Sequence, residues 1–149
     1  MTRHDRFDSL FLWFASSWEL GVQLDPMLLK AQAIAESNMD PKAVSRVGAQ
    51  GLCQFMPATW REVMGDADPF NPESSIQAQC VYMARLLRRF ESNTAKALAA
   101  YNWGQGNVSR VLTAHGEDHW LAHCPAETQA YVDRILRLWH DFTAERVAR

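Results

Sequence analysis

LDPMLLKAQAIAESNMDP, residues 24–41, is the segment that decides the fold. Asp25 followed by Pro26 places a side-chain acceptor at the N-cap and a proline at the first helical position, which is a strong start signal for an α-helix. Leucine, isoleucine and alanine dominate the residues that follow, so Glu36 closes an otherwise apolar helix. Because Asn38 to Pro41 breaks the pattern, we predict a core helix that starts at Pro26 and ends near Ser37.

Helix signals recur on both sides of this segment. Asn71 and Pro72 repeat the cap-plus-proline device at the start of a long helix, Pro57 opens a short helix that ends at Gly65, and a last helix follows Pro125. Apolar residues at helical spacing support an N-terminal helix (Phe7, Leu10, Phe11, Phe14, Trp18), the long helix (Ile76, Cys80, Met83, Leu86, Leu87, Phe90) and the last helix (Tyr131, Ile135, Leu138, Phe142).

Two segments complete this outline. The alanine-rich stretch from Thr94 to Tyr101 predicts a fully buried helix, which Asn102, Gly104 and Gly106 are expected to terminate. Val44 to Pro57 has little periodicity and is predicted to be a structured loop. Since no segment alternates β-branched and polar residues over any length, the fold class is mainly α. We expect one domain over residues 1–149, acting as a monomer.

Composition excludes several classes of function. The 149 residues are 48% apolar with a formal net charge of −2, so the chain is globular and has no general positive field to attract nucleic acid. No apolar stretch reaches the roughly 20 residues that span a bilayer, and no membrane insertion is expected. Cys53, Cys80 and Cys124 are too few and too dispersed for a disulfide framework or a zinc site. His115, His119 and His123 are better explained as a solvated loop than as metal ligands.

The N-terminus resembles a signal peptide only superficially. Asp5 and Asp8 lie within the segment that would have to be basic, the apolar run is short, and no clear cleavage site follows. Helical periodicity explains the segment better. We therefore expect synthesis in the cytoplasm without a leader.

Glu36 is the strongest candidate for chemistry. A single glutamate is usually a solvated surface group, and that alternative applies here too. At the end of a core helix, however, partial burial would raise the pKa of the carboxyl group and keep it protonated near neutral pH. Such a group can donate a proton to a leaving oxygen.

The order of motifs resembles the soluble lytic transglycosylase family, whose fold is lysozyme-like of the goose type. AIAESNMDPKAVSRVGAQGLCQFMPATW, residues 33–60, is similar to the family's core, ALAAYNWGQGNV, residues 97–108, to its tyrosine-asparagine-glycine segment, and ETQAYVDRIL, residues 127–136, to its last motif. GVQLDPMLL, residues 21–29, resembles the approach to the catalytic helix. The resemblance spans about residues 7–138.

The resemblance implies a role for several residues. It makes Glu36 the catalytic acid/base and places Ser45 near the reacting sugar. The residues that would contribute to substrate binding are Ser45, Gln54, Met56, Tyr101, Asn102 and Glu127. Most have an alternative explanation: Met56 and Tyr101 as core residues, Ser45 and Gln54 as partners of loop backbone groups, and Glu127 as a first-turn carboxylate favoured by the helix dipole.

Three positions depart from the family pattern. Cys53 stands where methionine is common, Trp103 where a small residue is usual, and Gln105 where proline is frequent. Trp103 is either a sugar-stacking platform or a core residue, and we favour the core.

The resemblance also implies the reaction. Ordinary glycosidases use two carboxylates, whereas only Glu36 is evident here, since Asp40 is better explained by turn formation. In the family, the N-acetyl group of N-acetylmuramic acid (MurNAc) assists cleavage of its bond to N-acetylglucosamine (GlcNAc), and the product is 1,6-anhydro-MurNAc. No cofactor or metal is required. The alternatives are a water-using muramidase on the same fold and a peptidoglycan-binding module without catalysis.

Partners and location follow from the same resemblance. Peptidoglycan glycan strands would be the substrate. A domain that lacks a secretion signal and an anchor resembles a bacteriophage endolysin for host cell lysis, delivered with the help of a holin. A virion-associated enzyme and a secretion-system enzyme are the competing sources.

Overall fold

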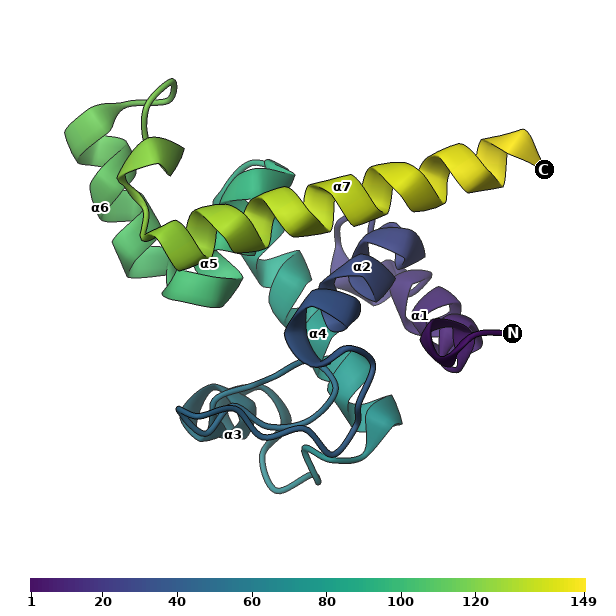
Figure 1. The fold of residues 1–149 in the computed structure, drawn as a ribbon. Helices are drawn as coiled ribbons and strands as arrows, with labels where there is room; N and C mark the ends of the chain where they lie inside the picture. Colours follow the sequence, from purple (N-terminus) through teal and green to yellow (C-terminus); the bar gives the residue numbers. More distant parts are fainter.

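The fold consists of α-helices joined by loops and short 3₁₀ turns (Figure 1). The computed structural model describes the backbone of residues 1–149 and every side chain other than that of Trp18. Its elements are η1 (Arg3–Asp5), α1 (Asp8–Ala15), η2 (Trp18–Leu20), α2 (Pro26–Ser37), α3 (Pro57–Met64), α4 (Pro72–Arg89), α5 (Thr94–Trp103), α6 (Gln105–His115), η3 (Leu121–His123) and α7 (Ala126–Ala148). The described backbone forms only two isolated β-bridges, so the predicted mainly α class is confirmed.

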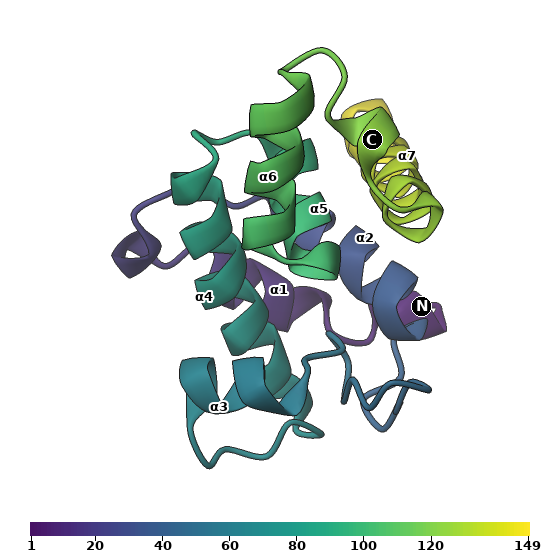
Figure 2. The same ribbon diagram turned by 90° about the vertical axis from the view of Figure 1, so that its left-hand side faces the viewer.

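Helix α2 lies at the centre of the molecule. It packs against α1 on one side and against the long helix α7 on the other, as both views show (Figures 1 and 2). Its start follows the prediction, because the Asp25 carboxylate accepts a hydrogen bond from the Met27 backbone N–H at 2.9 Å. Seven consecutive residues, Leu28 to Ile34, are buried. Because these residues are packed on every side of α2, the position of the last turn of the helix is fixed. Glu36 lies in that turn.

Helices α4 and α5 build the other half of the core. Helix α4 contacts α1, α3 and α5, and α5 contacts α7. The predicted N-cap of α4 is confirmed, since Asn71 accepts a hydrogen bond from the Ser74 backbone N–H at 3.0 Å. No helix in the described part of the chain is long and apolar enough to cross a membrane.

The predicted end of the alanine-rich helix was wrong. Asn102 lies inside α5, and Gly106 lies in the first turn of a further helix, α6, that the sequence did not predict. Only Gly104 interrupts the helical backbone there, because its φ of 104° and ψ of 140° form a conformation that favours glycine. Gly106 does not end a helix, because it lies in a first helical turn, where the backbone N–H groups have no partner within the helix.

The N-terminal helix is shorter than its apolar pattern. Phe7 and Phe11 are buried as predicted, and Leu10 and Phe14 pack against the same core. Helix α1 ends at Ala15, so Trp18 belongs to the separate turn η2, and its side chain lies outside the described residues.

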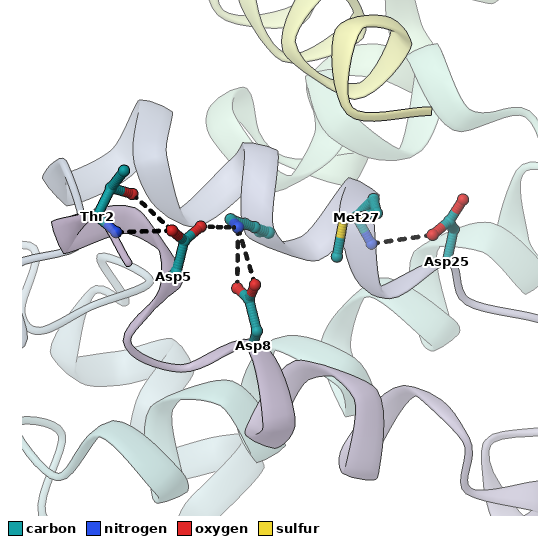
Figure 3. A network of polar contacts seen from close by, with 6 residues as sticks. Thr2, Asp5, Asp8, Asp25 and Met27 are labelled. Carbon is teal, nitrogen blue, oxygen red and sulfur yellow. Dashed lines mark hydrogen bonds and ion pairs between the residues drawn. The ribbon is translucent and has the colours of Figure 1, made fainter. Parts of the chain in front are cut away.

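An ion-pair cluster attaches the N-terminus to α2 (Figure 3). The Lys30 ammonium lies 2.8 Å from a carboxylate oxygen of Asp5 and 2.9 Å from one of Asp8, with only 6% of the Lys30 side chain exposed. The hydrogen bond from Lys30 lowers the pKa of Asp5 well below its ordinary value. Burial opposes the charge on Lys30, but hydrogen bonds to both aspartates raise its pKa above the ordinary value.

Lys30→Met is expected to destabilise the protein by about 2 kcal/mol at neutral pH, less than for a fully buried pair because both aspartates are partly exposed. A depressed carboxyl pKa contributes stability above the unfolded value of 3.8 that is lost as pH falls. The difference in stability between wild type and Lys30→Met, measured by thermal unfolding, should therefore be smaller at pH 2 than at pH 7. Lys42→Met, at an exposed position, is the matched control. An equal deficit at both pH values would contradict the ion-pair explanation.

Candidate active site

The last turn of α2 opens into a cavity of about 390 Å³. The helix ends abruptly because Asn38 and Met39 both take positive φ angles, of 53° and 65°. Ser37 connects this end to the loop that follows, since its hydroxyl donates to the carbonyl oxygen of Leu52 at 2.7 Å. Glu36, partly buried, lines the cavity from this position.

All of the sequence-predicted site residues line this one cavity. Glu36 comes from α2, Tyr101 and Asn102 from α5, and Glu127 from α7, while the loop before α3 contributes Ser45, Gln54 and Met56. The lining also includes Ala35, Val47, Ala49, Phe55, Thr59, Tyr82 and Tyr131. Residues far apart in the sequence are thus brought together by the packing of α7 against α2 and α5.

The carboxyl group of Glu36 is protonated at neutral pH. Burial raises its pKa from 4.5 to about 8, hydrogen bonding from the Tyr131 hydroxyl lowers it, and the negative charge of Glu127 raises it further. This agrees with the expectation that a carboxyl group at the end of a core helix retains its proton. The group can therefore act as a general acid at pH 7.

Ser45 and Gln54 both have structural partners. The Ser45 hydroxyl accepts from the Ala49 backbone N–H at 3.0 Å. The Gln54 side-chain nitrogen donates to the carbonyl oxygens of Ala43 at 3.1 Å and Gly51 at 2.9 Å. Both side chains therefore hold the loop in shape while they line the cavity, and the two explanations considered for them are compatible.

Tyr101 and Asn102 face the cavity from α5. The Tyr101 hydroxyl donates to the carbonyl oxygen of Cys53 at 2.8 Å, and its ring lies 5.5 Å from that of Phe55 and 5.4 Å from that of Tyr82. The Asn102 side-chain oxygen accepts from the Thr128 hydroxyl at 2.8 Å, so the structure connects α5 to the first turn of α7. Asn102 thereby presents its amide nitrogen for other partners.

Met56 and Glu127 are the exposed members of the set. Met56 is 43% exposed, so the alternative that it is an ordinary core residue was wrong. Glu127 lies in the first turn of α7, and its charge acts on the pKa of Glu36. From the sequence, Glu36 was the one evident catalytic carboxylate and Glu127 a substrate-binding residue, and the structure brings both carboxylates to the same cavity.

Tyr131 is a further residue of the site that was not predicted from the sequence. Its spacing on α7 predicted a core position, yet its side chain lines the cavity and its hydroxyl lies near Glu36. A tyrosine within an apolar stripe does not reveal what its hydroxyl contacts, so only the resemblance of its motif could have indicated it. Trp103 packs against the core as predicted. Asp40 accepts from the Lys42 backbone N–H at 3.0 Å, which is turn geometry.

The prediction that His115, His119 and His123 form a solvated loop is only partly correct: all three are exposed, but His115 is the last residue of α6 and His123 belongs to the turn η3. The rings of His115 and His123 stack at 3.4 Å, parallel within 5°. Within the described residues, no group of three or more histidine, cysteine, aspartate or glutamate side chains is arranged to hold a metal ion. Cys53, Cys80 and Cys124 are buried free thiols.

Comparison with known proteins assigns the chain to a family. The family model of the transglycosylase SLT domain matches residues 13–120. The chain therefore belongs to the transglycosylase SLT domain family. It is similar to membrane-bound lytic murein transglycosylase D of Escherichia coli K12, with 32% identity over 123 residues, which cover 76% of this chain and 27% of that protein.

Solved structures of the family share the fold. Lytic transglycosylase Slt of Pseudomonas aeruginosa, solved as an inactive mutant, superposes with a TM-score of 0.81 at 26% identity, over 97% of this chain and 25% of that chain. The 70 kDa soluble lytic transglycosylase of Escherichia coli gives 0.78 at 28% identity, over 93% and 25%. The predicted lysozyme-like fold is confirmed. The chain spans about a quarter of the length of the relatives it matches.

Proposed function

We propose that this chain is a peptidoglycan lytic transglycosylase domain that cleaves the β-1,4 bond between MurNAc and GlcNAc and forms 1,6-anhydro-MurNAc. The observation that carries the proposal is the Glu36 carboxyl group, whose burial raises its pKa to about 8 in a cavity large enough for sugar rings. The names of the relatives support the substrate class, since they are lytic murein transglycosylases. The inactive Pseudomonas mutant carries glutamine in place of one glutamate.

The proposed reaction balances without water. Glu36 donates its proton to the glycosidic oxygen, the bond from that oxygen to C1 of MurNAc breaks, and the N-acetyl oxygen bonds to C1 in its place. The Glu36 carboxylate then removes the proton of the 6-hydroxyl, whose oxygen displaces the N-acetyl oxygen at C1. Glu36 ends the cycle protonated, and the product carries the 1,6-anhydro ring.

Other cavity residues would bind the glycan. The Asn102 amide nitrogen, the Ser45 hydroxyl and the Glu127 carboxylate offer the polar groups that sugar hydroxyls and acetamides require. The exposed thioether of Met56 offers an apolar surface to a ring face. The buried acid beside them favours catalysis over binding alone, because a binding module does not need a desolvated acid.

The test is incubation with purified peptidoglycan sacculi. A transglycosylase releases soluble glycan fragments, with a rate that falls as pH rises through about 8 and Glu36 loses its proton. A peptidoglycan-binding module would sediment with the sacculi and release none. That result would overturn the proposal.

A water-using muramidase remains the second candidate because Glu127 shares the cavity with Glu36. In that reaction Glu127 would be the second carboxylate, so Glu127→Gln would lower the rate about a hundredfold or more. As a transglycosylase, the variant should retain activity within about tenfold.

Glu127→Gln should also lower the pH at which activity falls, because the negative charge of Glu127 raises the pKa of Glu36. Glu145→Gln, on the same helix but away from this cavity, is the matched control. A hundredfold loss confined to Glu127→Gln would favour the muramidase.

Action in host lysis by a bacteriophage, with a holin for delivery, stays a prediction. This prediction can be tested separately: the isolated domain should lyse cells only when a membrane-permeabilising protein is supplied.

A further inference from the structure

Two glutamines are buried beneath the candidate active site. Gln32, on α2, lies one helical turn before Glu36, and Gln79 faces it from α4; both side chains have 0% exposure. A buried amide group is unfavourable unless it is hydrogen bonded. The partners of these two amides therefore define their orientation.

The hydrogen bonds run in one direction only. The Gln79 side-chain nitrogen donates to the Leu29 carbonyl oxygen and to the Gln32 side-chain oxygen, both at 2.9 Å. A backbone carbonyl can only accept, so a reversed Gln79 amide would place two oxygens against each other. Gln32 must then present its nitrogen to the Tyr131 hydroxyl oxygen, at 2.9 Å.

This arrangement leaves the Tyr131 proton free to point toward Glu36. A hydroxyl has one proton, and the Tyr131 oxygen already accepts from Gln32. Hydrogen bonding from Tyr131 lowers the pKa of Glu36 against the effect of burial. Tyr131 and Glu36 also line the same cavity.

We propose that Gln32 and Gln79 are positioning residues that aim the Tyr131 hydroxyl at Glu36, so that it donates to the carboxylate formed when the proton leaves for the glycosidic oxygen. The inference rests on the proposed function of Glu36. A second observation supports it: the Gln79 side-chain oxygen is buried without a partner among the described residues. The Gln79 amide group thus keeps the orientation in which its nitrogen donates to Gln32, although its own oxygen makes no hydrogen bond.

Three other titratable groups lie near the same carboxyl group. Glu127 on α7 raises the pKa of Glu36, and the negative charge of Glu36 in turn raises the pKa of Tyr101 on α5 and of Cys53 in the loop. None of them is hydrogen bonded to Gln32 or Gln79 in the described structure. Replacing a glutamine should therefore act on Glu36 through Tyr131.

The test combines Gln32→Met with Tyr131→Phe. Gln32→Met keeps the side-chain length and removes the amide, so kcat on sacculi should fall about tenfold with KM unchanged within about twofold. NMR titration of carboxyl-labelled glutamate should show a higher pKa for Glu36. In the Tyr131→Phe background, Gln32→Met should change neither kcat nor this pKa, because the group it aims is gone.

Gln129→Met is the matched control, since Gln129 donates to the Ala122 and Cys124 carbonyl oxygens away from the cavity. Thermal unfolding would follow each variant; if Gln32→Met does not fold, Gln79→Met takes its place. Unchanged kcat and pKa in the single variant, or additive effects in the double variant, would overturn the inference. If the wild type cleaves no sacculi, the proposed function fails, whereas the NMR titration still decides whether Gln32 acts on Glu36.

Discussion

Glu36→Gln is expected to reduce the release of soluble fragments from sacculi by about a thousandfold. Glutamine preserves the shape of the side chain and can accept from Tyr131, but it has no acidic proton to donate to the glycosidic oxygen. Binding to sacculi, measured by sedimentation, should stay within about twofold of wild type. A variant that keeps wild-type cleavage would remove Glu36 from the mechanism.

The same substitution has a predicted effect on stability. Because burial raises the pKa of Glu36 to about 8, its contribution to stability is fully present below 4.5 and is lost as pH rises through 8. Glutamine does not ionise, so Glu36→Gln should melt at a higher temperature than wild type at about pH 9 and at a similar temperature at about pH 4. Glu145→Gln should show no such pH-dependent gain. A lower melting temperature under the alkaline condition would mean that the charged form is well solvated.

Gly51→Ala is expected to destabilise the protein by about 3 kcal/mol. Gly51 has a φ of 81°, and a Cβ at this position would lie 2.1 Å from the carbonyl oxygen of Pro69. The backbone would have to move, and with it the loop that carries Ser45, Gln54 and Met56 into the cavity. Denaturant unfolding measures the loss, and cleavage of sacculi by the folded fraction should also fall.

Gly48→Ala is the matched control for this prediction. Gly48 has a φ of 92°, and a Cβ at this position would meet nothing within 4 Å. The variant should therefore lose only the conformational part, about 1 kcal/mol. Equal losses in the two variants would show that the close approach to Pro69 is unimportant.

The helices that begin with a side-chain cap could be predicted from the sequence. Asp25 and Asn71 each precede a proline, and both cap the helices that they were expected to start. Helix α6 was missed because Gly104 and Gly106 together resemble a loop, although only Gly104 has a backbone conformation that favours glycine. Two glycines so close in sequence cannot be told apart by composition.

From the sequence, the residues of the candidate site could be predicted only where they belong to a recognisable motif. Burial of Glu36 followed from its place at the end of an apolar helix, whereas the convergence of Tyr101 and Glu127 on it was implied by the resemblance alone. Gln32 and Gln79 gave no signal, since an isolated glutamine within a helix usually faces solvent. Their pairing depends on how α2, α4 and α7 come together, which no local pattern encodes.

The central claim is that one carboxyl group, Glu36, cleaves the glycan with the substrate's own 6-hydroxyl in place of water. Mass spectrometry of the fragments released from sacculi tests it most directly. We predict fragments that end in 1,6-anhydro-MurNAc, lighter by one water than hydrolysed ones. Fragments that end in reducing MurNAc would contradict the account and assign the water-activating role to a second carboxylate such as Glu127.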